Sequence, residues 1–129
     1  MSVISTHVLD TALGKPAADI SVRLERREGG GWIELSATGG AAERVQDAPD
    51  GWIEVAAGVT DADGRCPDLA RDATRGEYRL TFDTGVYFAR QGRASIYPEI
   101  SITFTCDGKT HYHLPLLLSD NSYTTYRGS

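Results

Sequence analysis

Three histidines are the side chains of this sequence best suited to chemistry. His111 and His113 flank Tyr112 in a run with strand character, and side chains two positions apart leave the same face of a strand. His7 lies far earlier, in the run Ser5-Thr-His-Val-Leu-Asp. Because imidazole titrates near neutral pH and also binds metal ions, these three residues could transfer protons or hold a metal.

The spacing of the histidines leaves three interpretations open. An HxH pair and a distant third histidine could complete a tetrahedral zinc site together with a water molecule. The same imidazoles could instead carry out acid–base chemistry without a metal. Strand histidines can also be purely structural, hydrogen-bonded at a surface or an interface. No Asp or Glu is marked by its position as the carboxylate partner that zinc-binding histidines usually have.

Arg65 is the fourth candidate, because it ends the tight turn Thr60-Asp-Ala-Asp-Gly-Arg. The Asp63-Gly64 pair bends the chain and projects Arg65 at a strand end. A guanidinium there could bind a planar, oxygen-rich ligand through two parallel hydrogen bonds. The alternative is an ordinary surface arginine.

Alternating apolar and polar residues predict the strands that must position these side chains. The pattern runs through residues 20–26, 77–83 and 99–106, and its β-branched and aromatic content is typical of half-buried strands. One face carries Ile20, Val22 and Leu24, then Tyr78, Leu80 and Phe82, then Ile100, Ile102, Phe104 and Cys106. We therefore predict an all-β protein, a sandwich of two antiparallel sheets.

Two local signals interrupt this pattern. Residues 84–91 have helical character, and Gly92 could end such a helix. Asp107-Gly108 lies between two strand patterns and predicts a β-hairpin.

A short stretch of the sequence is duplicated. Gly31-Trp-Ile-Glu-Leu and Gly51-Trp-Ile-Glu-Val are near copies, offset by 20 positions. We predict a single domain over residues 1–129 with an insertion or duplication around 29–48. One copy should hold the regular place in a sheet and the other should extend an edge or leave the sheet, with residues 39–50 forming an exposed loop.

Length and composition exclude several protein classes. The 129 residues fit one domain, and a net charge of −5 argues against a general nucleic-acid binder. The longest apolar run, from Leu114 to Leu118, is far shorter than the ~20 residues that span a bilayer. Because the N-terminal residues show no secretory signal, we expect a cytoplasmic protein. Cys66 and Cys106 should then be reduced, buried thiols.

Taken together, three segments resemble the 5-hydroxyisourate hydrolases, the purine-catabolic branch of the transthyretin-like family. They are residues 5–17, residues 60–65, and residues 111–119 together with the closing Tyr126-Arg-Gly-Ser. The closing motif is the most specific element, since it separates the hydrolases from the hormone-carrying transthyretins. The resemblance implies an eight-stranded transthyretin-like sandwich with one short helix, assembled as a homotetramer with active sites in the grooves where dimers meet.

The resemblance also implies an activity. Family members hydrolyse 5-hydroxyisourate to 2-oxo-4-hydroxy-4-carboxy-5-ureidoimidazoline in urate breakdown, without a metal or cofactor. The alternative is a non-catalytic transthyretin-like protein that binds a small ligand. For the tetramer, the expected subunit contacts are the apolar side chains of the last strand and its neighbour, namely Leu114, Leu116, Leu118 and Tyr123.

The family's catalytic set, carried over residue by residue, falls on His7, Arg65, His113 and Ser129, and its substrate contacts on His7, Arg65 and Tyr126. We expect His7 to deprotonate water, His113 to assist proton transfer to the leaving nitrogen, and Arg65 to hold substrate oxygens. Ser129 would orient substrate or relay a proton, and His111 receives no firm role. Asp61 stands where the family usually has Asn, a change that the turn should tolerate.

Overall fold

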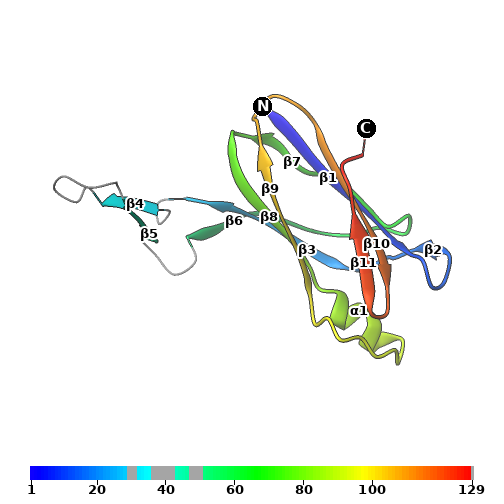
Figure 1. Ribbon diagram of the computed structural model, residues 1–129. Helices are drawn as coiled ribbons and strands as arrows, with labels where there is room; N and C mark the ends of the chain where they lie inside the picture. Colours follow the sequence, from blue (N-terminus) through cyan, green and yellow to red (C-terminus); the bar gives the residue numbers. More distant parts are fainter. Residues whose placement is uncertain (29–31, 36–42, 47–50, 129) are drawn as a thin grey trace.

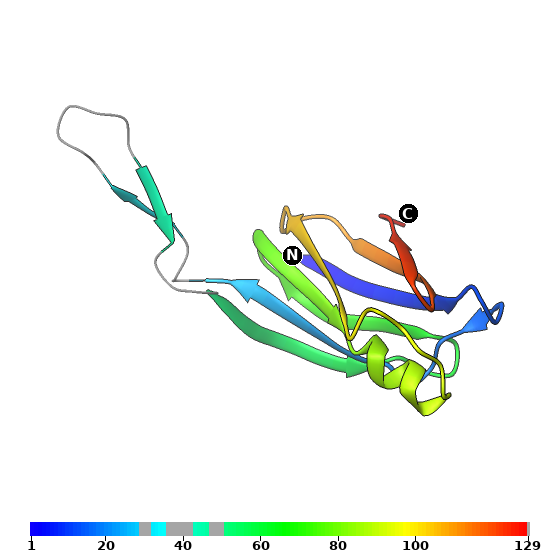
Figure 2. The same cartoon turned by 60° about the horizontal axis from the view of Figure 1, so that its bottom comes forward.

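Two sheets pack face to face in this computed structural model (Figures 1 and 2). The structure describes residues 1–28, 32–35, 43–46 and 51–128, with side chains only in the first and last of these ranges. Sheet A contains β1 (Ser2–Asp10), β2 (Lys15–Pro16), β7 (Arg65–Ala73), β10 (Tyr112–Ser119) and β11 (Ser122–Thr125). Sheet B contains β3 (Ser21–Arg27), β6 (Trp52–Val59), β8 (Gly76–Phe82) and β9 (Ile100–Cys106).

The predicted all-β sandwich is confirmed. Sheet B has the order β6-β3-β8-β9 and all its pairs are antiparallel. Sheet A has the order β11-β10-β1-β2, with β7 also pairing β1. Within sheet A the β1–β10 pair is parallel, so the N-terminal strand runs beside the strand that follows the last crossover between the sheets.

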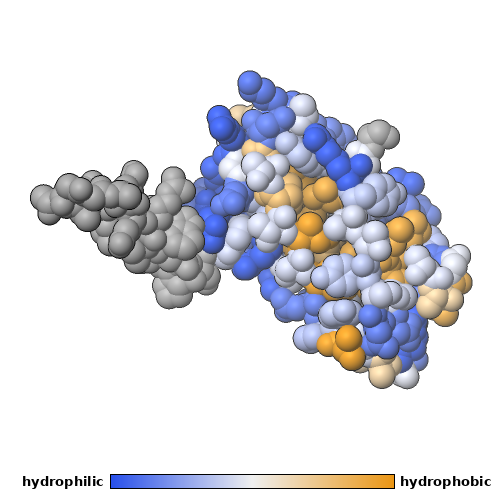
Figure 3. Space-filling view, in the orientation of Figure 1, coloured by the Kyte–Doolittle hydropathy of each residue, from blue (hydrophilic) through white to orange (hydrophobic). Residues whose placement is uncertain are grey.

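The core lies between the sheets and follows the predicted alternation. Val22 and Leu24 of β3 face Leu80 and Phe82 of β8 within sheet B, and all four are buried. From β9, Ile102 and Phe104 are partly buried against this core, and Figure 3 shows apolar atoms gathered between β9 and β11.

The leucines of β10 correct one prediction. Leu114, Leu116 and Leu118 are only 7%, 0% and 1% exposed, because their positions on β10 point into the core. They are therefore not available for subunit contacts. Of the predicted set only Tyr123 is exposed, at 41%.

The predicted helix is confirmed as α1 (Thr84–Arg90). Gly92 has φ +66°, and its N–H donates to the Ala89 carbonyl, while the Arg93 N–H donates to the Phe88 carbonyl. These bonds end the helix where the glycine permits a left-handed backbone. No helix within the described ranges is long and apolar enough to cross a membrane.

Asp107-Gly108 does not form the predicted hairpin. β9 pairs with β8 in sheet B and β10 pairs with β1 in sheet A, so this turn carries the chain from one sheet to the other. The Asp107 carboxylate accepts the N–H groups of Lys109 and Thr110, which bends the chain locally. The turn residues were identified correctly, but a local turn signal does not determine which sheet the next strand joins.

The duplicated copies take different places, as predicted. The second copy is β6, which pairs with β3 in sheet B. The first copy is β4 (Trp32–Leu35), which pairs with β5 (Glu43–Gln46) as a separate two-stranded sheet. β5 lies within the stretch expected to be a loop, so that part of the prediction was wrong (Figure 1).

Candidate functional site

β1 brings the three separated motifs together, because it lies between β7 and β10 in sheet A. Its parallel register with β10 places Ser5 opposite His113 and His7 opposite Pro115. Its antiparallel register with β7 places His7 opposite Arg65. Residues from three distant parts of the chain therefore occupy neighbouring strands.

These side chains point away from the core. On β1, Ile4, Thr6 and Val8 are fully buried whereas His7 is partly exposed, and on β10 His113 is partly exposed between buried Tyr112 and Leu114. Alternation along a strand thus turns both histidines to the outer face of sheet A.

The turn at residues 61–65 is built to present Arg65. The Asp61 carboxylate accepts the N–H groups of Asp63 and Arg65, each at 2.9 Å. Only an oxygen acceptor is needed there, so the amide of an Asn would serve equally. Gly64 has φ +74°, and a Cβ at this position would lie 2.3 Å from the Val8 carbonyl oxygen, which makes glycine necessary.

The same turn fixes the ring of His7. Its Nε2 lies 2.9 Å from the carbonyl oxygen of Asp63. A carbonyl oxygen only accepts hydrogen bonds, so Nε2 carries a proton and Nδ1 is the nitrogen free to accept one. The partner that orients this histidine is therefore a backbone group, which no side-chain pattern in the sequence could reveal.

His111 and His113 meet at one hydroxyl group. Ser5 Oγ lies 2.8 Å from Nδ1 of His113 and 3.2 Å from Nε2 of His111. Burial lowers the pKa of His113, and the nearness of His7, His111 and Arg65, which disfavours a positive charge on its ring, lowers it further. His113 is therefore neutral at neutral pH.

A groove of about 460 Å³ lies over these residues. Its lining residues are Ser5, Thr6, Arg65, Pro67, Asp68, His111 and His113. His7 is not among them and borders the groove as the neighbour of Arg65 across the β1–β7 pair. A second hollow of equal volume lies between β3 and β6 and has no histidine, and its Arg23 is paired with Asp83. The chemistry therefore belongs to the groove on sheet A.

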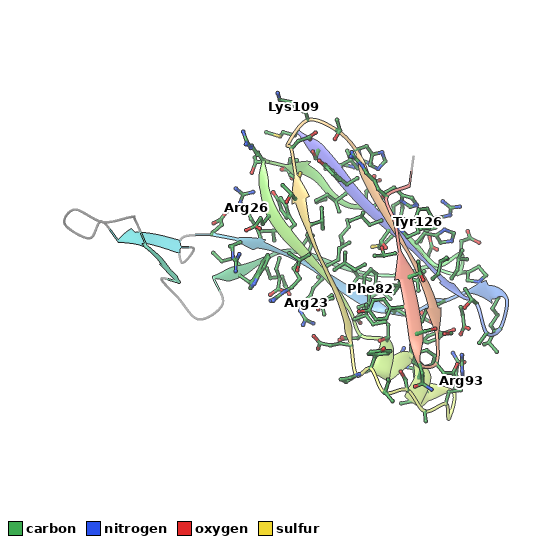
Figure 4. The ribbon with its side chains drawn as sticks, viewed as in Figure 1. Arg23, Arg26, Phe82, Arg93, Lys109 and Tyr126 are labelled. Atoms are coloured by element: carbon green, nitrogen blue, oxygen red, sulfur yellow. The ribbon has the colours of Figure 1, made fainter. Side chains whose placement is uncertain are left out.

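The C-terminal tail closes one side of this site. Gly128 forms a bridge with His113, and its N–H donates to the His113 carbonyl at 2.7 Å. The Arg127 guanidinium lies 4.1 Å from the ring centre of Tyr112 and donates to the His111 carbonyl. Tyr126 is 53% exposed at the end of β11 (Figure 4). The predicted site residue Ser129 lies outside the described residues.

Comparison with known proteins identifies the family. A model of the HIUase/Transthyretin family matches residues 4–128. The chain is 41% identical over 132 residues to 5-hydroxyisourate hydrolase of Mus musculus, covering 99% of this chain and 96% of that protein. The chain belongs to the HIUase/Transthyretin family.

Structures of both branches of the HIUase/Transthyretin family resemble the chain. Klebsiella pneumoniae 5-hydroxyisourate hydrolase superposes with a TM-score of 0.75 at 35% identity, over 100% of both chains. Transthyretin from Sparus aurata superposes with a TM-score of 0.78 at 29% identity, over 97% of this chain and 95% of that one. Because the fold is common to both branches, the distinction between them rests on sequence identity and on the site residues.

Two further functional groups of this family member were not singled out from the sequence. Ser5 was seen only as part of a strand motif, and its link to both histidines depends on the parallel β1–β10 register. Gly128 was seen only as part of the closing motif, and its close approach to His113 needs the tail to be folded back. Among the residues that the structure describes, no group of three or more His, Cys, Asp or Glu side chains is arranged to hold a metal ion.

Proposed function

We propose that this protein hydrolyses 5-hydroxyisourate, opening its six-membered ring to give 2-oxo-4-hydroxy-4-carboxy-5-ureidoimidazoline. The observation that carries the proposal is the meeting of His7, Arg65 and His113 on the outer face of sheet A, beside the Tyr-Arg-Gly-Ser tail. Relatives covering nearly the whole chain at 37–41% identity are named 5-hydroxyisourate hydrolase. These features favour the hydrolase over a non-catalytic carrier.

His7 is the proposed base for the attacking water. Its Nε2–H is held by the Asp63 carbonyl, which leaves Nδ1 to remove a proton from water. The water oxygen then bonds to the ring carbonyl carbon, and negative charge develops on the carbonyl oxygen. The backbone partner keeps the ring in one orientation, so the base does not have to be positioned during the reaction.

Arg65 and His113 are proposed to complete the ring opening. Arg65 makes no side-chain hydrogen bond or ion pair within the described part of the chain, so its guanidinium is available for the substrate oxygens. It stabilises the developing oxyanion. When the C–N bond breaks, the nitrogen takes a proton, and neutral His113 can supply it from a ring N–H.

The remaining roles are proposals that rest on the family resemblance and on position. Tyr126 contacts the substrate from the tail, and Ser129 orients it or relays a proton. No metal or cofactor takes part in this proposed reaction. We also propose a homotetramer with its sites between dimers, and the outer face of sheet A beside the histidines offers the partly exposed Leu9 and Leu117 for such contacts. A cytoplasmic location is a further proposal, which cell fractionation would test.

The activity is tested by following the decay of freshly generated 5-hydroxyisourate with and without the protein, after treatment with a chelator. We expect decay much faster than the spontaneous reaction. Decay at the spontaneous rate, together with tight binding of a small ligand such as thyroxine, would instead support the carrier. Gel filtration at the monomer mass would overturn the tetramer.

A further inference from the structure

The geometry points to Ser5 as a positioning residue that fixes the ring tautomer of His113 and, with His111, supplies His113 with protons from solvent. This inference rests on the proposed function, because it concerns how the same site is kept in its active protonation state. It begins from the only hydroxyl group in the described part of the chain that is hydrogen-bonded to two histidine rings.

The Ser5 hydroxyl can donate only one proton, and this couples the two rings. It has one O–H donor and two acceptor sites, so it cannot donate to both ring nitrogens at once. If Ser5 donates to Nδ1 of His113, then Nε2 of His111 must be the N–H that donates to Ser5. The tautomer of each neutral ring therefore depends on the other through this single oxygen.

The distances favour one of the two arrangements. The 2.8 Å separation from His113 suits an O–H donor, and the 3.2 Å separation from His111 suits a longer N–H donor. In that arrangement Nδ1 of His113 is unprotonated and Nε2 carries the hydrogen. Nε2 of His113 makes no hydrogen bond to any residue with a described side chain, so this N–H is free to protonate a leaving nitrogen in the groove.

The three hydrogen-bonded residues, Ser5, His113 and His111, differ in their access to solvent. Ser5 is only 4% exposed, His113 is partly exposed, and His111, which directly precedes β10, is exposed. Water therefore reaches the chain of hydrogen bonds most easily at His111. The order from solvent to substrate is His111, then Ser5, then His113.

The proton movements balance along this order. His113 gives its Nε2 proton to the leaving nitrogen, and Ser5 passes its hydroxyl proton to Nδ1 of His113. Ser5 takes the proton from Nε2 of His111, and His111 takes a proton from solvent at Nδ1. Each ring ends neutral with its tautomer exchanged, and one proton has moved from solvent to product. After product leaves, Nε2 of His113 takes a proton from water in the groove and the chain returns one to solvent at His111, which restores the starting tautomers.

The charges around His113 suit a neutral relay. His7 faces it from β1, Arg65 and Asp68 from β7, and His111 from the position directly before β10. Arg65 disfavours a positive charge on the His113 ring. A histidine that must stay neutral can still deliver a proton if another proton arrives at its second nitrogen at the same time.

The experiment compares S5A, S5T and H111Q with the matched control S119A, which removes a serine hydroxyl from β10 at the opposite end from His113. We expect kcat to fall about tenfold in S5A with KM within twofold, and S5T to restore at least a third of the lost rate. H111Q should lose a similar factor, and the S5A/H111Q double variant should be no slower than the worse single variant. S119A should match the parent.

Nuclear magnetic resonance of the 15N-labelled histidine rings supplies a readout that a merely structural role would not move. We expect His113 in the parent protein to show an unprotonated Nδ1 and a protonated Nε2, and a mixture of tautomers in S5A. Retention of the parent tautomer in S5A, kcat within twofold of the parent, or losses that multiply in the double variant would each overturn the inference. If the parent protein proved inactive, the proposed function would fail, while the tautomer measurement would still decide the role of Ser5.

Discussion

Replacing Gly128 with alanine should slow catalysis without unfolding the protein. A Cβ at this position would lie 2.8 Å from Cδ2 of the His113 ring, whereas ordinary contacts begin near 3.4 Å. The ring is held on its other side by Ser5 at 2.8 Å, so either the ring or the tail must move by about 0.6 Å, the difference between those contact distances. A misplacement of about 1 Å can cost 10²-fold in rate, so we expect kcat to fall about tenfold.

The assay is steady-state hydrolysis of 5-hydroxyisourate, with thermal unfolding measured in parallel. The matched control is Gly14→Ala, because Gly14 has φ +68° and open space around it. That variant should lose about 1 kcal/mol of stability from its left-handed backbone but keep its kcat. A Gly128→Ala protein that is folded and has kcat within twofold of the parent would refute the claim that the tail fixes the His113 ring.

Three other predictions follow from the described contacts. Arg65→Lys should lower kcat by about 10²-fold in the hydrolysis assay, because one ammonium group cannot make two parallel hydrogen bonds to the substrate. Thermal unfolding should be unchanged, and a loss in kcat below threefold would contradict the role of Arg65 in holding substrate oxygens. Asp10 is fully buried, and although burial raises its pKa, hydrogen bonds from Arg93 and Tyr87 lower it overall. The ionised Asp10 carboxylate should therefore stabilise the fold fully above its unfolded pKa of about 3.8, and this stabilisation should be lost as the pH falls through the lower folded value. Asp10→Asn should lower the free energy of unfolding by about 3 kcal/mol in urea at pH 7, and a loss below 1 kcal/mol would contradict the role of this carboxylate. Because the pKa of His113 is lowered from 6.5, its ring should titrate below pH 6.5 when followed by nuclear magnetic resonance, and a midpoint above pH 7 would contradict a neutral His113.

The strands and the helix could be predicted from the sequence because their signals are local. Alternation marked the core positions of β3 and β8, and Gly92 marked the end of α1. The same local signals could not show that the Asp107-Gly108 turn joins two different sheets, because strand partners are chosen by packing over the whole chain. That is also why the β10 leucines were assigned to the surface.

The candidate site was predicted only in part. Residue type and position made His7, Arg65 and His113 candidates, the family resemblance assigned them to the catalytic set, and the structure brings all three together. The spacing of the histidines alone left zinc binding, acid–base chemistry and a structural role open. The Asp63 carbonyl and Ser5 hydroxyl, which orient the histidine rings, could not be found without the register of β1 with its two neighbours.

The central claim is that His7 and His113 act together on one substrate molecule. The most direct measurement is kcat for 5-hydroxyisourate in the parent protein and in the His7→Ala, His113→Ala and double variants, with each protein shown to be folded. We predict that each single variant loses about 10²-fold or more and that the double variant is little slower than the worse single variant. Single variants within threefold of the parent would contradict this account of the site.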